Sequence, residues 1–139
     1  FNPSEKLRFS RHSPCDCFLF NGFTSTMYAL ELKSVQTNSI SFERSKEDKG
    51  VIHYYQIESL KKFSNYHNVV AGFILDFRSS DNTYFIDIDN FISMINEIAK
   101  KSFNEKDLLK YSPILIEKKK LKVNYRYNVK KFLEDTKLN

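Results

Sequence analysis

The sequence predicts an α/β fold, in which β-strands and α-helices follow one another along a single domain of residues 1–139. Three observations favour it. Pairs of β-rich runs flank turn-forming residues, apolar residues recur with helical periodicity between them, and aromatic residues make up 15% of the chain. A chain of this length suits one hydrophobic core rather than two.

The first β-rich pair lies near the start of the chain. Residues 1–14 are polar and basic, and we expect a flexible segment there with at most a short strand at Leu7–Phe9. Cys15–Phe20 and Met27–Lys33 then surround Asn21-Gly22, a dipeptide that favours tight turns. These features predict a β-hairpin.

A second hairpin is predicted after a loop and a helix. The loop covers residues 35–50 and the helix covers Val51–Tyr66. Val69–Phe77 and Thr83–Ile88 are apolar and rich in β-branched residues, and residues 78–82 between them are typical of a turn.

The remainder of the chain is predicted to be mainly helical. Asp89 is the expected N-cap of a helix that continues to Lys101, and Ser102 with Glu105 forms a capping-box pattern for a short helix that ends at Tyr111. The last expected features are the basic run Lys118–Lys120, a strand at Leu121–Tyr125 and a helix at Val129–Thr136.

Charge and composition favour a polyanionic partner and an intracellular location. Lys and Arg exceed Asp and Glu by 22 to 17, which gives a net charge of +5. Cys15 and Cys17 are expected to point the same way on one strand as reduced thiols. No apolar run approaches the roughly 20 residues that span a bilayer, so we expect a cytoplasmic protein without a membrane partner. Because Phe1 is not an initiator, an upstream segment is expected to be missing.

The second strand of the first hairpin carries two opposite charges on one face. Alternation puts Ala29, Glu31 and Lys33 on one side and the larger apolar residues on the other. An isolated Glu-x-Lys is usually an ion pair on a half-exposed strand. The preceding strand favours a different interpretation.

That strand brings a second carboxylate to the same face, because cross-strand pairing places Asp16 near Glu31. Two carboxylates repel each other unless a cation or a proton is present, so Mg²⁺ or Mn²⁺ bound by Asp16 and Glu31 is predicted. In phosphodiester hydrolysis such a cation polarises a phosphoryl oxygen and lowers the pKa of a bound water. Lys33 would orient the water or stabilise the developing charge, which makes all three residues candidates for catalysis.

These residues resemble a known family. Asp16 followed by Glu31-Leu32-Lys33 is similar to the PD-(D/E)xK nuclease motif, and Pro14-Cys15-Asp16 is close to its literal beginning. A closer resemblance is to RecU-type Holliday-junction resolvases. Tyr54–Leu60 looks like their His-Gln-Ile-Glu helix, with Gln56 at the position of a glutamine beside the active site.

The resemblance covers most of the chain from about Ser13, since Val70–Phe77, Tyr84–Ile86 and the basic, Tyr-rich tail also match in order. It implies a restriction-endonuclease-like core with a mixed central β-sheet flanked by helices. It further implies a Mg²⁺-dependent endonuclease that resolves four-way DNA junctions in recombination and repair, with Gln56 among its catalytic residues. A junction is nearly two-fold symmetric and needs paired cuts, so a homodimer is the matching assembly.

Two positions depart from the resolvases. The family has an acidic residue on an N-terminal helix, whereas no helix is evident before Asp16 and Glu5 is a poor substitute. The family's histidine before the glutamine is Tyr55 here. Two alternatives stay open: a non-catalytic DNA-binding module of the same fold, and a related endonuclease that acts on linear duplex DNA.

DNA contacts are expected from basic and polar residues around the site. Arg8, Arg11 and Lys46 are candidates for phosphate binding. The resolvases use polar residues just after the Glu-x-Lys strand, which implies substrate contacts for Thr37, Asn38 and Ser39. An ordinary exposed loop is the alternative for these three residues.

Overall fold

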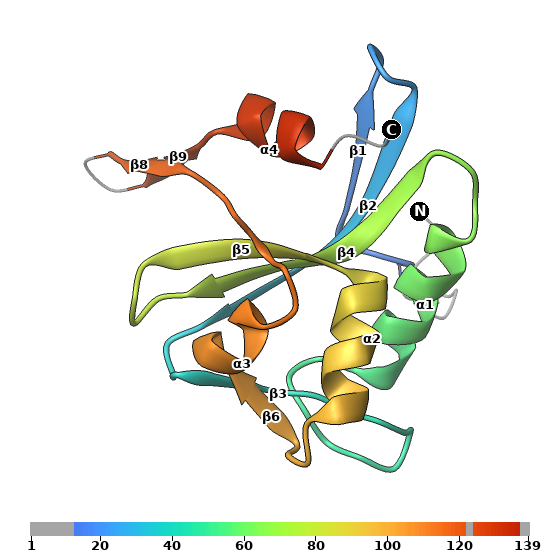
Figure 1. Cartoon of the computed structure of the whole chain (residues 1–139), viewed down its shortest axis with the longest axis vertical. Coiled ribbons are helices and arrows are strands. Elements are labelled where there is room, and N and C mark those ends of the chain that lie inside the picture. Colours follow the sequence, from blue (N-terminus) through green and yellow to red (C-terminus); the bar gives the residue numbers. More distant parts are fainter. Residues whose placement is uncertain (1–12, 122–123, 137–139) are drawn as a thin grey trace, which may run out of the picture.

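The computed structural model describes residues 13–121 and 124–136. In chain order the elements are β1 (Cys17–Asn21), β2 (Thr26–Val35), β3 (Ser39–Ser41), α1 (Tyr54–Ser64), β4 (Val69–Phe77), β5 (Asn82–Asp87), α2 (Ile88–Glu97), β6 (Ser102–Asn104), α3 (Glu105–Leu109), β7 (Ile114–Leu115), β8 (Lys118–Lys120), β9 (Tyr125–Tyr127) and α4 (Val129–Asp135). Strands and helices follow one another, as the sequence predicts (Figure 1).

The central sheet has five strands in the order β1-β2-β4-β5-β7. β2 and β4 run parallel, whereas every other neighbouring pair in this sheet is antiparallel. The parallel pair needs a long crossover, and α1 lies within it. The expectation of a mixed central sheet flanked by helices is therefore confirmed.

The two faces of the sheet are covered unequally. α1 and α2 pack on one face, where Leu60 and Phe91 join Phe73 and Leu75 in the larger cluster of buried residues. On the other face the short α4 inserts Phe132 against the ring of Tyr28, at 5.6 Å between ring centroids. Figure 1 shows α1 and α2 side by side and α4 apart from them.

Both predicted hairpins form, with small changes at their ends. β1 and β2 pair from Cys17 opposite Leu30 to Asn21 opposite Thr26, and β4 and β5 pair antiparallel as predicted. Their turns contain Ser25 and Asp81 with positive φ values of 52° and 57°. Asp tolerates this left-handed conformation better than most residues.

Helices α1 and α2 begin at different residues from those predicted. The chain enters α1 at Tyr54 rather than Val51 because Ile52 forms a β-bridge with Phe42. α2 is capped by Asp87, whose Oδ1 accepts a hydrogen bond from the backbone N–H of Asp89. The predicted cap at Asp89 is thus two residues too late.

The segment around Ser102 is also different from the prediction. Ser102 begins β6, which pairs antiparallel with β3 in the region that was expected to be a loop. The capping box of α3 is formed by Asn104 and Asp107 instead.

The C-terminal part contains a second small sheet. β8 and β9 form an antiparallel hairpin in place of the strand predicted at Leu121–Tyr125, and α4 follows close to its predicted position. Figure 1 shows β8 and β9 extending away from the central sheet. The short strand expected at Leu7–Phe9 lies outside the described residues. No helix in the described ranges is long and apolar enough to cross a membrane.

Candidate active site

Asp16 and Glu31 meet at the end of the first hairpin. Cys17 pairs with Leu30, so the next step of the register sets Asp16 opposite Glu31. The chain bends at Asp16, where the backbone pairing of β1 with β2 stops. The Asp16 side chain continues the contact with β2, because its Oδ2 accepts a hydrogen bond from the backbone N–H of Leu32 at 2.9 Å. The predicted proximity of the two carboxylates is confirmed.

Glu31 is buried, with 5% of its surface exposed, on the face of β2 that α1 covers. Its neighbour Ala29 lies in the cluster beneath α1 and α2, whereas Tyr28 and Leu30 lie in the cluster beneath α4. Alternation along β2 therefore holds as predicted, and Lys33, two residues after Glu31, is half-buried.

Gln56 links the start of α1 to Glu31. Its Nε2 donates a hydrogen bond to Glu31 Oε1 at 2.7 Å, and its Oε1 accepts the backbone N–H of His53 at 2.9 Å. Gln56 is itself buried, and these two hydrogen bonds give both ends of its amide the partners that a buried polar group needs. The same side chain caps the helix and holds one oxygen of the carboxylate.

The environment of Glu31 disfavours its negative charge. Burial raises its pKa from 4.5 to about 7, and hydrogen bonding and repulsion from the Asp16 carboxylate act in the same direction. Lys33 lowers the pKa, but its effect is smaller. Without a cation, Glu31 therefore holds a proton through much of the range below neutral pH.

A second buried acid, Glu43, adjoins this site and was not predicted. Its Oε2 lies 3.0 Å from Nδ1 of His53, and the His53 ring stacks on Tyr55 at 5.5 Å between centroids. A polar chain thus runs from Glu31 through Gln56 and His53 to Glu43. No local pattern signals the burial of Glu43, because it depends on the β-bridge between Phe42 and Ile52 beside it.

The donor set at Asp16 and Glu31 fits a small, hard cation. Within residues 13–121 and 124–136, no group of three or more His, Cys, Asp or Glu side chains is placed to hold a metal. Mg²⁺ commonly uses only one or two protein carboxylates and completes its shell with water and substrate phosphates. The two carboxylates, which are held in place by hydrogen bonds from the Leu32 N–H and from Gln56, meet that minimum requirement.

The residues predicted to contact DNA are spread over several segments. Thr37 and Asn38 are exposed in the turn between β2 and β3, Ser39 begins β3, and the Thr37 hydroxyl donates to the carbonyl of Ser39 at 2.9 Å. Lys46 is exposed in the following loop, while Arg8 and Arg11 lie outside the described residues. The structure therefore brings together Asp16, Glu31, Lys33 and Gln56, and their roles in catalysis stay predictions.

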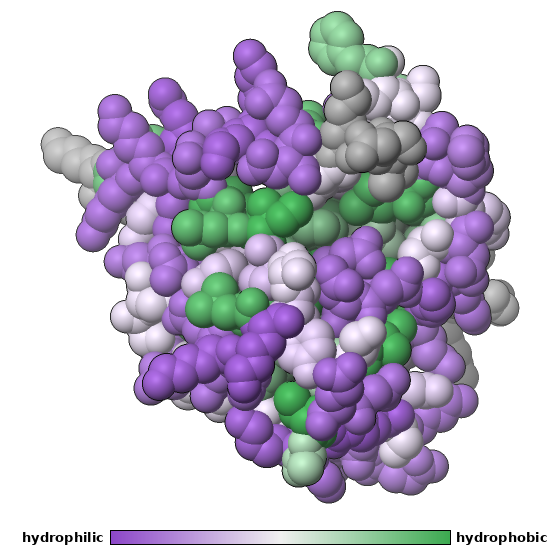
Figure 2. Space-filling model, viewed as in Figure 1, coloured by the Kyte–Doolittle hydropathy of each residue, from purple (hydrophilic) through white to green (hydrophobic). Residues whose placement is uncertain are grey.

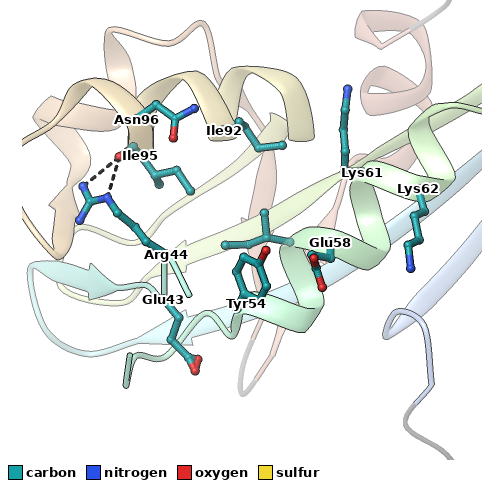
Figure 3. Close-up of a pocket in the computed structure, with 10 residues that line it drawn as sticks. Glu43, Arg44, Tyr54, Glu58, Lys61, Lys62, Ile92, Ile95 and Asn96 are labelled. Carbon is teal, nitrogen blue, oxygen red and sulfur yellow. Dashed lines mark hydrogen bonds between the residues drawn. The ribbon is translucent and has the colours of Figure 1, made fainter. Parts of the chain in front are cut away.

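A cavity of about 390 Å³ lies between α1 and α2 (Figure 3). Its wall includes Arg44, whose guanidinium donates to the carbonyls of Ile95, Ile98 and Lys100 at 2.7 to 3.1 Å. These bonds satisfy backbone oxygens where α2 ends. Arg44 therefore has a structural role here.

A larger cleft of about 440 Å³ lies against the opposite face of the sheet. Leu30, Ile74 and Phe132 give it an apolar wall, and Lys33 and Tyr127 also line it. Figure 2 shows an apolar band below the hydrophilic residues of the β8–β9 region. The cleft thus lies between the central sheet and Tyr127 of the second small sheet, on the face opposite to the one that carries Glu31.

The two cysteines are free thiols on different faces. Cys15 is buried in the cluster beneath α1 and α2, which raises its thiol pKa, whereas Cys17 packs against the cluster beneath α4. The prediction that both point the same way is wrong, because the chain bends at Asp16 before β1 begins.

Fold and site together define an α/β protein with a carboxylate pair, a lysine and a glutamine at one end of its first hairpin. No known family model matches the chain. It is similar to the SPbeta prophage-derived uncharacterized protein YotM of Bacillus subtilis (strain 168), with 34% identity over 129 residues. The match covers 84% of this chain and 62% of that relative, so the chain spans less than two thirds of the relative's length.

Proposed function

We propose that the chain is a metal-dependent endodeoxyribonuclease with a PD-(D/E)xK core that resolves four-way DNA junctions. The observation that carries the proposal is the direct approach of Asp16 to the buried Glu31, with Lys33 on the same strand and Gln56 bonded to Glu31. A buried carboxylate beside a second carboxylate is costly to ionise without a counter-charge, and groups with such perturbed pKa values cluster at functional sites.

Each residue has a defined part in this reaction. Asp16 and Glu31 would hold Mg²⁺ or Mn²⁺, which when bound supplies Lewis-acid polarisation of the scissile phosphate and a more acidic water. Gln56 fixes the orientation of Glu31 through its 2.7 Å bond, and the backbone N–H of Leu32 fixes Asp16. Lys33 places a positive charge where negative charge develops on the phosphoryl oxygens.

The choice of a four-way junction rests on the resemblance of the motif order to RecU-type resolvases. The same resemblance supports a homodimer, whose two sites would cut the paired strands of a junction in recombination and repair. A composition rich in Lys and Asn suits a phage or an organism with A·T-rich DNA, and the relative is described as prophage-derived.

The decisive experiment is cleavage of a labelled four-way junction and of a linear duplex of the same length, with Mg²⁺, Mn²⁺ or EDTA. Asp16→Asn keeps an acceptor for the Leu32 N–H but removes the charge, and Lys33→Met keeps most of the lysine's apolar stem. Both variants should lose at least about 100-fold in rate. Glu47→Gln, at an exposed position, is the control and should retain full activity.

A non-catalytic DNA-binding module is the second candidate. It is favoured by the finding that the candidate site has only two carboxylates within the described residues. In that case the wild-type chain would bind junctions tightly, Asp16→Asn would bind equally well, and neither metal would give cleavage. Faster cleavage of the linear duplex than of the junction would instead indicate a related nuclease for duplex DNA.

A further inference from the structure

The positive charge of this protein is concentrated in one short segment. We call Glu117–Lys131 the basic hairpin, since it contains β8, β9 and the start of α4. It holds seven basic residues and one acidic residue, whereas the rest of the chain holds fifteen basic and sixteen acidic residues. The net charge of +5 therefore comes from the basic hairpin, outside which the chain is close to neutral.

Lys118 anchors the basic hairpin to the central sheet. Its Nζ lies 3.5 Å from Oδ1 of Asp76 and 3.1 Å from the hydroxyl of Thr83, and its side chain is only 10% exposed. The ring of Tyr125 covers the ammonium at 4.5 Å, and the Tyr125 hydroxyl donates to Asp81 at 3.0 Å. The base of the hairpin is thus fixed, and Lys118 is not free to bind a ligand.

The other face of the hairpin presents an unresolved repulsion. Lys119 lies directly opposite Arg126 in the antiparallel register, so the two cationic side chains share one face. Both residues are exposed, and neither has an ion pair with any residue in the described part of the chain. By contrast, Lys131 is matched by Glu117 at 3.3 Å and by Asp135 at 3.7 Å.

Like charges directly opposite each other destabilise a strand pair, and an anion bound to both would remove that cost. A phosphodiester group suits this position, because Arg and Lys together supply a fork of donors and a point charge. Lys119 and Arg126 both line a pocket of about 490 Å³ on the hairpin.

We propose that the basic hairpin, through Lys119 and Arg126, binds the phosphodiester backbone of duplex DNA. This inference rests on the proposed function, because that function is the reason for choosing DNA as the ligand. Binding itself does not require cleavage, so the two can be tested separately.

The test measures DNA binding by fluorescence anisotropy in EDTA, with a labelled linear duplex and a labelled four-way junction, over a series of salt concentrations. The double variant Lys119→Gln/Arg126→Gln is compared with Lys62→Gln/Lys101→Gln, which removes the same charge from exposed positions on α1 and after α2. Loss of two phosphate contacts should raise Kd about 10- to 30-fold near 0.15 M salt and reduce the slope of log K against log salt by about 2. The single variant Lys119→Gln should give about half of that change in slope.

Equal weakening by both double variants would overturn the proposal, as would an unchanged slope or a wild-type chain that binds neither DNA. Thermal unfolding of each variant checks that the fold is intact. If the hairpin variant loses binding while the wild type cleaves nothing with Mg²⁺ or Mn²⁺, the nuclease proposal fails and the binding site stands. If the wild type cleaves DNA with Mg²⁺ or Mn²⁺ and the hairpin variant binds DNA as tightly as the wild type, the DNA-binding role of the hairpin fails and the nuclease proposal stands.

Discussion

Gln56 Nε2 lies 2.7 Å from Glu31 Oε1, and this hydrogen bond joins the first turn of α1 to the centre of β2. A glutamine at this position keeps the carboxylate oriented without adding charge. Because of this contact, the stability of the first turn of α1 depends on the ionisation of Glu31. Several variants can test this dependence.

Gln56→Glu should destabilise the protein at high pH and leave it nearly unchanged at low pH. The new carboxyl group still accepts the His53 N–H, but above about pH 7 it repels Glu31 and donates no hydrogen bond to it. We expect a loss of about 1 to 3 kcal/mol of unfolding free energy near pH 8 in EDTA, and little change near pH 5. Urea unfolding at both pH values measures this, with the exposed Gln36→Glu as a charge-matched control. An equal loss at both pH values would contradict the expectation.

The raised pKa of Glu31 gives a pH dependence of stability with a defined sign. Because the folded protein holds the proton more tightly, with a pKa of about 7 against 4.5, this stabilisation is complete below about pH 4.5 and is lost as pH rises through 7. Glu31→Gln should remove the dependence and be more stable than the wild type near pH 8 by about 1 to 3 kcal/mol in EDTA. Glu47→Gln should follow the wild type across the same pH series. A wild-type curve parallel to that of Glu31→Gln would show that the site does not titrate in this range.

The same substitution should have different effects on stability at two neighbouring lysines. Lys118→Met leaves Asp76 without its partly buried counter-charge and should cost about 1 to 3 kcal/mol in urea unfolding. Lys119→Met relieves the repulsion from Arg126 and should change stability by no more than about 0.5 kcal/mol, or increase it. The double-mutant cycle of Lys118→Met with Asp76→Asn should show coupling. Similar effects of both lysine substitutions would argue against the anchoring role of Lys118.

Gly72 is required for close packing in the centre of the sheet. A Cβ atom there would lie 2.2 Å from the carbonyl oxygen of Ile86 and 2.7 Å from the ring of Phe85, so Gly72→Ala should cost about 3 kcal/mol or more. Gly22→Ala meets its nearest atom at 3.9 Å and should lie within about 1 kcal/mol of the wild type. Thermal unfolding of the two variants gives the comparison, and a small effect at Gly72 would mean that β4 and β5 can separate.

The sequence is sufficient to predict those parts of the fold that depend on neighbouring residues. Both hairpins follow from local turn chemistry and β-rich runs, and the shared face of Glu31 and Lys33 follows from strand alternation. The meeting of Asp16 with Glu31 is predictable for the same reason, because a hairpin aligns residues that are close in the chain.

The rest depends on contacts between distant segments. β3 pairs with β6, which is more than 60 residues further along the chain, and this pairing determines where α3 begins. Asp87 and Asp89 are equally good caps by local pattern, and the choice falls on Asp87 because β5 pairs up to that residue. The burial of Glu43 and the repulsion between Lys119 and Arg126 also appear only with the full register.

The position of β2, between a hairpin partner and a parallel partner, has a consequence for the order of folding. Asp16 and Glu31 are 15 residues apart and can approach as soon as the first hairpin closes, whereas β2 and β4 first meet through Met27 and Val69, 42 residues apart. The carboxylate pair should therefore assemble early and solvated, and Glu31 should be buried only when the crossover through α1 docks. During folding the charged pair is an obstacle to that docking, which a proton or a cation would ease.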